Sequence, residues 1–264
     1  MPISNYPVVL ITGVSGGIGQ ATARIFVANG WIVVGTVRTA RTKHVAGIDL
    51  QMAEMTRPAD LARVLGYVQR KYGRLDALVC NAGYALLGGL QTLSYAQMRD
   101  QFATNVLAPA ELTRLALPLL VASSGTAVAV SSVVGLTGLP GYSLYAASKH
   151  AVEGLYESLA LEYAAGPVRF KLVEPSGVNT AFWTSIKRGT SLGKSANAQT
   201  NPGPVPNRAN YNLTPEQVAL VIYRAAADRG PKLRFPVGQT KRLNLAKRLL
   251  PDTLYRRLLQ RFIV

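Results

Sequence analysis

The feature that most restricts the fold is a glycine-rich loop near the start of the chain. An apolar run of strand length, residues 8–12, passes directly into this loop, and helical periodicity follows to about Asn29. The loop reads Thr12, Gly13, Val14, Ser15, Gly16, Gly17, Ile18 and Gly19. Glycines permit a tight turn and a close approach of the backbone to a pyrophosphate, and the first amides of the helix donate hydrogen bonds to it. Such a loop between a buried strand and a helix predicts a dinucleotide-binding fold.

Further apolar runs of strand length recur along the chain and alternate with segments of helical periodicity. The predicted strands are residues 8–12, 31–37, 48–54, 75–80, 126–130, 169–173 and 233–237, and the main helical segments are 17–29, 59–72, 107–122 and 145–165. Strands that alternate with helices favour a parallel sheet. The length of 264 residues suits one domain. We therefore expect an α/β fold in which residues 1–264 form a single-domain, Rossmann-type, doubly wound parallel sheet of about seven strands with helices on both faces.

Tyr145 and Lys149 form a second pattern, about one helical turn apart at the start of the segment 145–165. Side chains at this spacing project from one face of a helix, which places a phenol beside an ammonium group. A nearby positive charge favours the phenolate, so we expect the pKa of Tyr145 to lie nearer neutrality than that of a free phenol. Ser132 follows the apolar run 126–130, where a hydroxyl can reach the same substrate atom. The three residues predict acid/base catalysis.

These motifs, together with Asn105 and the Asn-Ala-Gly run at 81–83, have the order and spacing found in a known family. The chain resembles the short-chain dehydrogenase/reductases over residues 8–182. Segments 81–90 and 132–161 are most similar to the hydroxysteroid and retinol dehydrogenases. The resemblance implies reversible hydride transfer between a nicotinamide cofactor and a carbonyl/alcohol pair, carried out by a homodimer or homotetramer.

The resemblance also implies roles for individual side chains. The catalytic residues would be Asn105, Ser132, Tyr145 and Lys149. Tyr145 would exchange a proton with the substrate oxygen, Ser132 would hydrogen-bond that oxygen, and Lys149 would also bind the nicotinamide ribose. Asn105 would hold a water beside Lys149 and complete a proton path.

The second predicted strand indicates which nicotinamide cofactor is used. In such folds an acid near this strand end binds the ribose hydroxyls, whereas an arginine accommodates the extra phosphate of NADP. Val37 occupies the usual acidic position and Arg38 follows it, so we expect NADP(H). By resemblance, the cofactor-binding residues are Gly13, Ser15, Gly16, Gly17, Ile18, Gly19, Arg38, Glu54, Met55, Asn81, Ala82, Gly83, Tyr145, Lys149, Pro175, Val178 and Thr180. Glu54 stands where the family usually has aspartate, and Pro175-Ser176 stands where it usually has Pro-Gly.

Candidate substrate contacts are mostly apolar or aromatic: Ser132, Leu139, Tyr142, Tyr145 and Phe182. They favour a hydrophobic ketone or aldehyde and its alcohol, of steroid, retinoid, lipid or aryl type. Residues 184–212 lack periodicity, which favours a substrate lid. Two alternatives stay open: a non-catalytic NADPH-sensing or scaffold protein on the same fold, and a sugar-nucleotide epimerase or dehydratase of a related branch.

The tail, residues 241–264, combines basic residues with leucines in a pattern typical of a basic amphipathic helix pair, and the whole chain carries a formal net charge of +16. Such helices can lie on an anionic membrane surface. Packing of the tail over the substrate pocket or a partner subunit is an equal alternative. No recognition helix, zinc module or aromatic-basic pattern supports nucleic-acid binding.

Composition bounds the remaining functions. The only histidines are His44 and His150, and no acidic cluster has ligand spacing, so we expect no metal site. The single cysteine, Cys80, excludes an intrachain disulfide and is expected to be a buried core residue in a reducing compartment. Arg114 and Pro118 interrupt the most apolar region, so we expect no membrane span. Without a recognisable signal peptide, a cytoplasmic location is expected, with peripheral membrane contact if the tail binds lipid.

Overall fold

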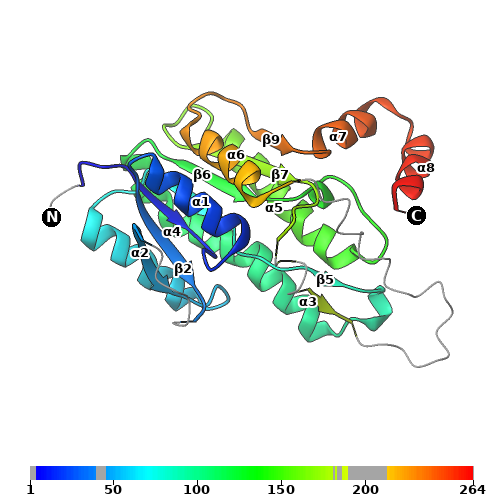
Figure 1. The fold of residues 1–264 in the computed structure, drawn as a ribbon, viewed down its shortest axis with the longest axis horizontal. Helices are drawn as coiled ribbons and strands as arrows, with labels where there is room; N and C mark the ends of the chain where they lie inside the picture. Colours follow the sequence, from blue (N-terminus) through cyan, green and yellow to red (C-terminus); the bar gives the residue numbers. More distant parts are fainter. Residues whose placement is uncertain (1–3, 40–45, 181, 183–185, 190–212, 264) are drawn as a thin grey trace.

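The structure, a computed structural model, describes residues 4–39, 46–180, 182, 186–189 and 213–263, and the side chains as far as residue 259. Seven parallel strands form one sheet in the order β3-β2-β1-β4-β6-β7-β9 (Figure 1). The strands are β1 (Val8–Ile11), β2 (Ile32–Val37), β3 (Ile48–Met52), β4 (Ala77–Cys80), β6 (Thr126–Val130), β7 (Arg169–Pro175) and β9 (Arg234–Val237). Each predicted apolar run supplies one strand, so the predicted sheet is confirmed. The strand order reverses between β1 and β4, which is where such sheets bind ligands.

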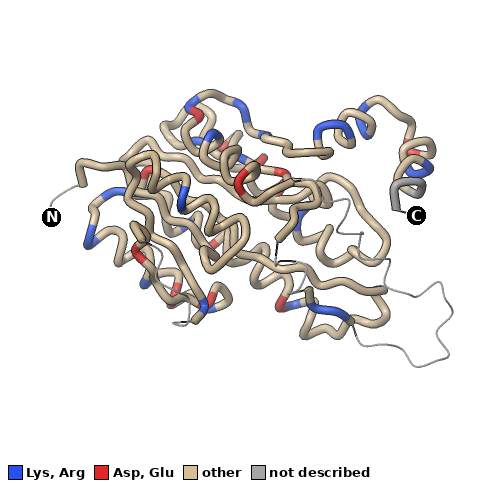
Figure 2. The backbone as a smooth tube through the Cα atoms, viewed as in Figure 1, with Lys and Arg blue, Asp and Glu red and all other residues tan. Residues whose placement is uncertain are grey.

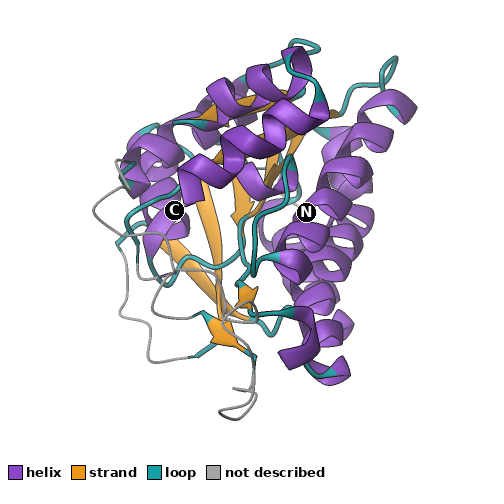
Figure 3. Ribbon diagram, turned by 90° about the vertical axis from the view of Figure 1, so that its right-hand side faces the viewer, coloured by secondary structure: helices purple, strands orange, loops and turns teal. Residues whose placement is uncertain are grey.

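Helices cover both faces of the sheet (Figure 3). They are α1 (Gly17–Ala28), α2 (Pro58–Tyr72), α3 (Tyr95–Phe102), α4 (Ala108–Ala122), α5 (Ser143–Glu162), α6 (Pro215–Ala227), α7 (Thr240–Leu249) and α8 (Asp252–Ile263). Side chains alternate along a strand. Val8 and Leu10 therefore pack with α2, α4 and α5 on one face, while Val9 and Ile11 pack with α1 and α6 on the other. This double burial explains why the strands read as continuous apolar runs.

One long helical stretch, Tyr95–Ala122, includes α4, which packs on one face of the sheet. Helix α3, the π-helical turn η2 (Ala103–Leu107) and α4 are continuous over Tyr95–Ala122, and this stretch is long and apolar enough to cross a membrane by length and composition alone. The expectation that Arg114 and Pro118 rule out such a segment was therefore wrong, since Pro118 lies within α4. Leu112 and Leu120 are buried in the main core, as in a core helix of a folded domain.

A small parallel sheet was not predicted. Strand β5 (Leu86–Leu87) pairs with β8 (Lys187–Arg188), and two single helical turns, η1 (Leu90–Thr92) and η3 (Val133–Gly135), complete the described elements. Strands of two residues are too short for a period to be recognised. The predicted lid at 184–212 lies outside the described residues, except for 186–189, which contain β8.

Cys80 lies at the end of β4 in the main core, as expected. Burial raises the pKa of its thiol to about 11. The thiol is therefore protonated and shielded at neutral pH.

Candidate active site

The carboxyl ends of β1, β4, β6 and β7 open into a cavity of about 1830 Å³. It lies where the strand order reverses, the position at which ligands bind in open α/β sheets. Every residue that the sequence assigned to catalysis, cofactor or substrate lines this cavity, except Asn105. The predicted positions, which are scattered along the sequence, therefore come together in one place.

The glycine loop forms one wall of the cavity. Gly13 and Gly17 have φ values of 74° and 53°, which side chains rarely adopt. A Cβ on Gly19 would lie 2.1 Å from the carbonyl oxygen of Gly13, so only glycine fits there. The N-cap residue of α1 is Gly16, which has no side chain to cap the helix, and the first turn contains no acidic residue. Its free amides face the cavity and fit a pyrophosphate, which supports a dinucleotide as the ligand.

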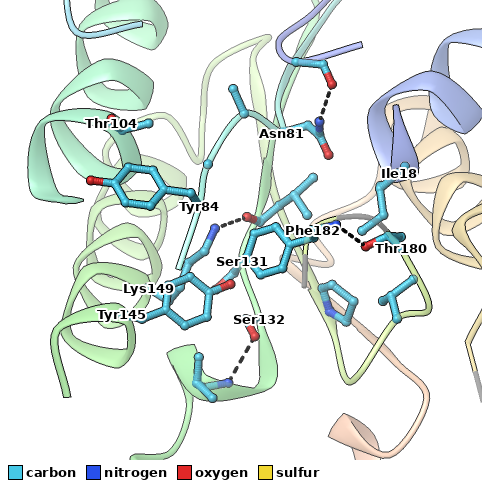
Figure 4. A pocket seen from close by; sticks show the side chains of 18 of the residues that line it. Ile18, Asn81, Tyr84, Thr104, Ser131, Ser132, Tyr145, Lys149, Thr180 and Phe182 are labelled. Carbon is cyan, nitrogen blue, oxygen red and sulfur yellow. Dashed lines mark hydrogen bonds between the residues drawn. The ribbon is translucent and has the colours of Figure 1, made fainter. Parts of the chain in front are cut away.

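Asn81 joins the ends of β1 and β4. Its side-chain amide donates hydrogen bonds to the carbonyl oxygens of Thr12 and Gly13, at 2.9 and 3.2 Å. The Thr12 hydroxyl in turn accepts hydrogen bonds from the backbone amides of Asn81 and Ala82, both at 2.9 Å. Sequence analysis gave Thr12 no role of its own. These bonds hold the glycine loop at a fixed distance from β4, and Figure 4 shows Asn81 on this side of the pocket.

The far end of the same wall carries positive charge. Val37 is buried at the end of β2, and Arg38 follows it with an exposed side chain that lines the cavity. Among the described residues no carboxylate pairs with Arg38. The Glu54 carboxylate accepts hydrogen bonds from the Thr56 amide and hydroxyl at 3.4 and 3.3 Å. Glu54 is therefore engaged locally, whereas Arg38 is available to a phosphate. We call this wall, from the glycine loop to Arg38, the glycine-loop side.

A loop after β7 closes the cavity above the glycine loop. Pro175 ends β7, Val178 is buried, and the Thr180 hydroxyl accepts a hydrogen bond from the Phe182 amide at 3.2 Å. A Cβ on Gly17 would lie 3.5 Å from Thr180, so the two loops are in contact distance. This loop brings Phe182 next to the catalytic candidates.

Ser132 and Tyr145 project into the middle of the cavity (Figure 4). Ser132 precedes η3, and its hydroxyl accepts a hydrogen bond from the Val134 amide at 3.4 Å. Tyr145 lies in the first turn of α5 and is 7% exposed. Burial raises the pKa of Tyr145, the Ser132 hydroxyl lowers it in part, and Tyr142 raises it further. The shift is opposite to the one expected from the sequence.

The position of Lys149 explains that correction. Its ammonium donates a hydrogen bond to the carbonyl oxygen of Val130 at 2.8 Å and lies 5.9 Å from the centre of the Tyr145 ring. Burial lowers the pKa of Lys149 to about 8, while the charge of Glu153 acts in the opposite direction. Lys149 is thus directed toward the strand end, and desolvation of the phenol is the largest cause of the raised Tyr145 pKa.

Asn105 lies behind the cavity wall, in the π-helical turn η2. Its amide group exchanges hydrogen bonds with the backbone of Tyr84, at 3.2 and 3.0 Å, and donates one to the Ser148 hydroxyl at 3.2 Å. A Cβ on Gly83 would lie 3.1 Å from the Asn105 carbonyl oxygen and 3.9 Å from the Lys149 ammonium. Asn105 therefore fixes the strand end next to Lys149, and its predicted water-holding role stays a prediction.

An ionic cluster that joins α5, β7 and β9 was missed by sequence reasoning. Arg234 of β9 bonds the carboxylates of Glu153, Glu157 and Glu174. Burial, reinforced by the neighbouring Glu153, raises the pKa of Glu174 to about 7. Glu153 lies one turn beyond Lys149 on α5. Two signals in the sequence could have indicated this cluster: Glu153 lies four residues after Lys149, and Glu174 directly follows the predicted strand 169–173. Among the described residues no group of His, Cys, Asp or Glu side chains is arranged to hold a metal ion.

The opposite wall of the cavity is apolar. Tyr142, Tyr145 and Val134 are buried in one cluster with Ala85, Leu87 and Ala146, against which Leu139, Phe182 and Ile186 pack. The Phe182 and Tyr145 ring centres are 6.2 Å apart. The Lys187 ammonium sits 4.5 Å from the centre of the Tyr84 ring and also lines the cavity. We call this wall, defined by that cluster, the apolar side.

The tail reaches the cavity as well. Arg242 and Leu243 of α7 and Leu259 of α8 line it, and the Lys247 ammonium donates a hydrogen bond to the Leu136 carbonyl oxygen next to the apolar side. Tyr255 of α8 is buried. The tail therefore packs beside the pocket, which is one of the two alternatives left open by the sequence, and contact of its other face with a membrane stays a prediction. Sequence reasoning did not assign any of these tail residues to the site.

Comparison with known proteins agrees with this geometry. A family model described as short chain dehydrogenase matches residues 7–191. The crystal structure of a short-chain dehydrogenase from Streptomyces avermitilis superposes with a TM-score of 0.83 at 29% identity, covering 97% of this chain and 96% of that one.

Two curated proteins are similar over most of their length. The NADPH-dependent 3-dehydrocapnine reductase of Ornithobacterium rhinotracheale is 30% identical over 262 residues, covering 92% of each chain. Retinol dehydrogenase 8 of Bos taurus is 33% identical over 257 residues, covering 86% of this chain and 80% of that protein. Because the family model, the fold and the motifs agree, this chain belongs to the short chain dehydrogenases, a family of oxidoreductases that bind a nicotinamide cofactor.

Proposed function

We propose that this protein is an NADP(H)-dependent oxidoreductase that interconverts a hydrophobic ketone or aldehyde and its alcohol. The observation that carries the proposal is the convergence of Ser132, Tyr145 and Lys149 on one cavity, between the glycine-loop side and an apolar wall. A non-catalytic NADPH sensor would need the first wall but not these three side chains.

The glycine-loop side supports NADP(H) over NAD(H). The uncapped amides of α1 suit a pyrophosphate, and Arg38 offers an exposed guanidinium where an acid would repel a 2′-phosphate. Asn81, Val178 and Thr180 would hold the remainder of the cofactor. Bound there, the cofactor supplies or accepts the hydride.

In the reductive direction of this reversible reaction, Tyr145 is the proton donor. Burial keeps the Tyr145 hydroxyl protonated at neutral pH, so this group serves as the proton donor to a carbonyl oxygen. The Ser132 hydroxyl donates a hydrogen bond to the same oxygen and stabilises its developing negative charge. Lys149 would hold the nicotinamide ribose of a bound cofactor and, through a water held by Asn105, would return a proton to Tyr145.

The apolar side supports a lipophilic substrate. Leu139, Tyr142 and Phe182 offer aromatic and aliphatic surface around Tyr145. The two curated relatives act, by their names, on retinol and on 3-dehydrocapnine. We assign the substrate of this chain to the class of steroid-, retinoid-, lipid- or aryl-type carbonyls and alcohols.

Assembly and location complete the proposal. Leu161 of α5 is 79% exposed and Leu107 of η2 is 63% exposed, so two neighbouring helices present apolar side chains to a partner subunit. We propose a homodimer or homotetramer in the cytoplasm. Light scattering that finds a monomer at every concentration contradicts the assembly.

The decisive experiment measures NADPH oxidation by the purified protein across hydrophobic ketones and aldehydes. NADH serves as the alternative cofactor and Tyr145→Phe as the inactive control. Turnover that depends on Tyr145 and prefers NADPH supports the proposal, and the panel ranks substrate classes. Tight NADPH binding without turnover of any substrate supports the sensor instead.

A further inference from the structure

The outward face of the tail carries exposed leucines. Leu245, Leu249 and Leu254 are 57%, 71% and 47% exposed, and Leu250 lies between them at the turn from α7 to α8. Single exposed leucines are common on protein surfaces, but a set within ten residues on one helix pair forms an apolar patch. Helices α7 and α8 project from the edge of the molecule beside β9 (Figure 1).

The same helices are strongly basic. Lys241, Arg242, Lys247, Arg248, Arg256 and Arg257 are exposed, and Asp252 is the one acidic residue between 240 and 259. Asp252 pairs with Arg256 at 2.8 Å, so the remaining cations have no acidic neighbour on these helices. Figure 2 shows the basic residues along both helices. Apolar side chains interleaved with cations suit a surface that is both anionic and hydrophobic.

The inner face of the pair belongs to the active-site cavity. Leu243 and Leu259 line the cavity, Tyr255 is buried, and Lys247 bonds the Leu136 carbonyl oxygen. One helix pair therefore has one face in the cavity and the opposite face exposed.

We propose that α7 and α8 dock this protein on an anionic phospholipid bilayer and pass a lipophilic carbonyl from the bilayer into the cavity. The delivery step rests on the proposed function, whereas docking does not. A nucleic acid would match the cations but gives no reason for the exposed leucines. A second copy of the chain would bring two faces of like charge together.

The primary test is sedimentation of the full chain with vesicles of phosphatidylcholine, with and without about 30% phosphatidylserine. Wild type binds the anionic vesicles and loses binding in high salt, because the charges are exposed. Each Lys or Arg near an anionic surface contributes roughly fivefold in partitioning. The variant Lys241→Gln/Arg248→Gln/Arg257→Gln, which leaves the cavity lining untouched, therefore binds about a hundredfold more weakly.

A matched control removes the same charge elsewhere. Arg24, Arg70 and Arg224 are exposed on α1, α2 and α6, and none forms an ion pair or a side-chain hydrogen bond with another described residue. Replacing all three by glutamine leaves vesicle binding within about twofold of wild type, because these sites lie on other helices than α7 and α8 and surface attraction falls off within about 10 Å. Equal weakening by the two triple variants overturns the proposal, since net charge alone would then explain binding.

The leucines give an independent arm. Leu249→Ser/Leu254→Ser weakens binding to anionic vesicles at least tenfold, whereas Leu220→Ser on α6 does not. Unchanged vesicle binding by the double variant overturns the proposal in favour of a purely ionic partner such as a nucleic acid. If wild type does not bind vesicles and is a dimer in light scattering, while Leu249→Ser/Leu254→Ser is a monomer, the occupant of this face is a second copy of the chain and the proposal is overturned.

The delivery step is measured with two aldehydes and NADPH. A long-chain aldehyde embedded in the vesicles is turned over more slowly by the tail triple variant, in proportion to its lost binding. A short water-soluble aldehyde is turned over at the wild-type rate by the same variant. Equal rates on the embedded substrate contradict delivery, whereas vesicle binding without turnover of any carbonyl contradicts the proposed function and leaves docking intact.

Discussion

The two walls of the cavity are built by different physical means. The glycine-loop side is made of backbone: amides at the start of α1, the close contact of Gly19 with Gly13, and the Asn81 bonds to loop carbonyls. The apolar side is made of side chains contributed by η3, α5, β5 and the segment around Phe182. Backbone contacts demand particular residues, whereas an apolar wall tolerates many side chains of similar volume. One wall should therefore fail abruptly on substitution and the other gradually.

Tyr145→Phe tests the boundary between the walls and has the largest expected effect. Removing the hydroxyl lowers kcat about a thousandfold, because the proton donor is lost. NADPH affinity, measured by fluorescence titration, stays at the wild-type value. Tyr142→Phe, whose buried hydroxyl has no hydrogen-bond partner among the described residues, is the matched control and lowers kcat less than tenfold. Comparable losses in the two variants would remove the special role of Tyr145.

Gly19→Ala breaks the glycine-loop side directly. Its Cβ would lie 2.1 Å from the Gly13 carbonyl oxygen, so the loop must shift and the free energy of unfolding falls by about 3 kcal/mol. Gly16→Ala meets nothing within 4 Å and keeps wild-type stability. Urea denaturation of both variants gives the comparison. If Gly19→Ala is as stable as Gly16→Ala, then close packing against the Gly13 carbonyl oxygen is not the reason for a glycine at position 19.

Arg38→Gln sharpens the comparison within the glycine-loop side, because it removes a side chain rather than a backbone contact. A charge-assisted hydrogen bond is worth about 1.5–3 kcal/mol. NADPH binding therefore weakens about tenfold or more, while NADH binding stays unchanged. Isothermal titration with each cofactor measures both, and parallel losses would show that Arg38 does not read the extra phosphate.

The last prediction concerns the acids that bond Arg234, outside the cavity: Glu153 and Glu157 of α5 and Glu174 of β7. The pKa of Glu174 is raised from 4.5 to about 7 in the folded state, so the folded protein binds the extra proton in this range. Its contribution to stability is therefore full below about pH 4.5 and is lost as the pH rises to 7. Relative to Glu174→Gln, wild type loses about 2 kcal/mol of unfolding free energy between about pH 5 and pH 7. Denaturant titrations across this range check the slope, and a difference that does not vary with pH contradicts the shifted pKa.

The same contrast explains what the sequence could predict. Glycines, the apolar runs and the Tyr145–Lys149 spacing are local patterns with one physical meaning, and all seven strands follow from them. The other predicted cavity residues came from the resemblance to the family. Asn105 is the exception, since its side chain points behind the wall. The direction of the Tyr145 shift failed because spacing gives proximity to Lys149, whereas desolvation depends on the whole buried surrounding.

The missed features are non-local. Arg234 meets Glu153 and Glu174 only because β7 and β9 are neighbours in the sheet. The β5–β8 pair joins segments about a hundred residues apart through two residues each. The tail residues Arg242, Leu243 and Leu259 line the cavity because they follow β9. The position of β9 in the sheet cannot be predicted from a linear sequence pattern.

Because Cys80 is buried, its rate of chemical labelling reports how often the surrounding structure opens. A thiol with a raised pKa, covered by core side chains, reacts with an alkylating reagent only when the surrounding structure opens. The chain contains one cysteine, so each labelled molecule records a single opening event at the end of β4, next to Asn81. A ligand that bridges β1 and β4 slows this labelling by its binding energy, whatever its chemistry. The labelling rate therefore detects occupancy of the glycine-loop side without any assay of turnover.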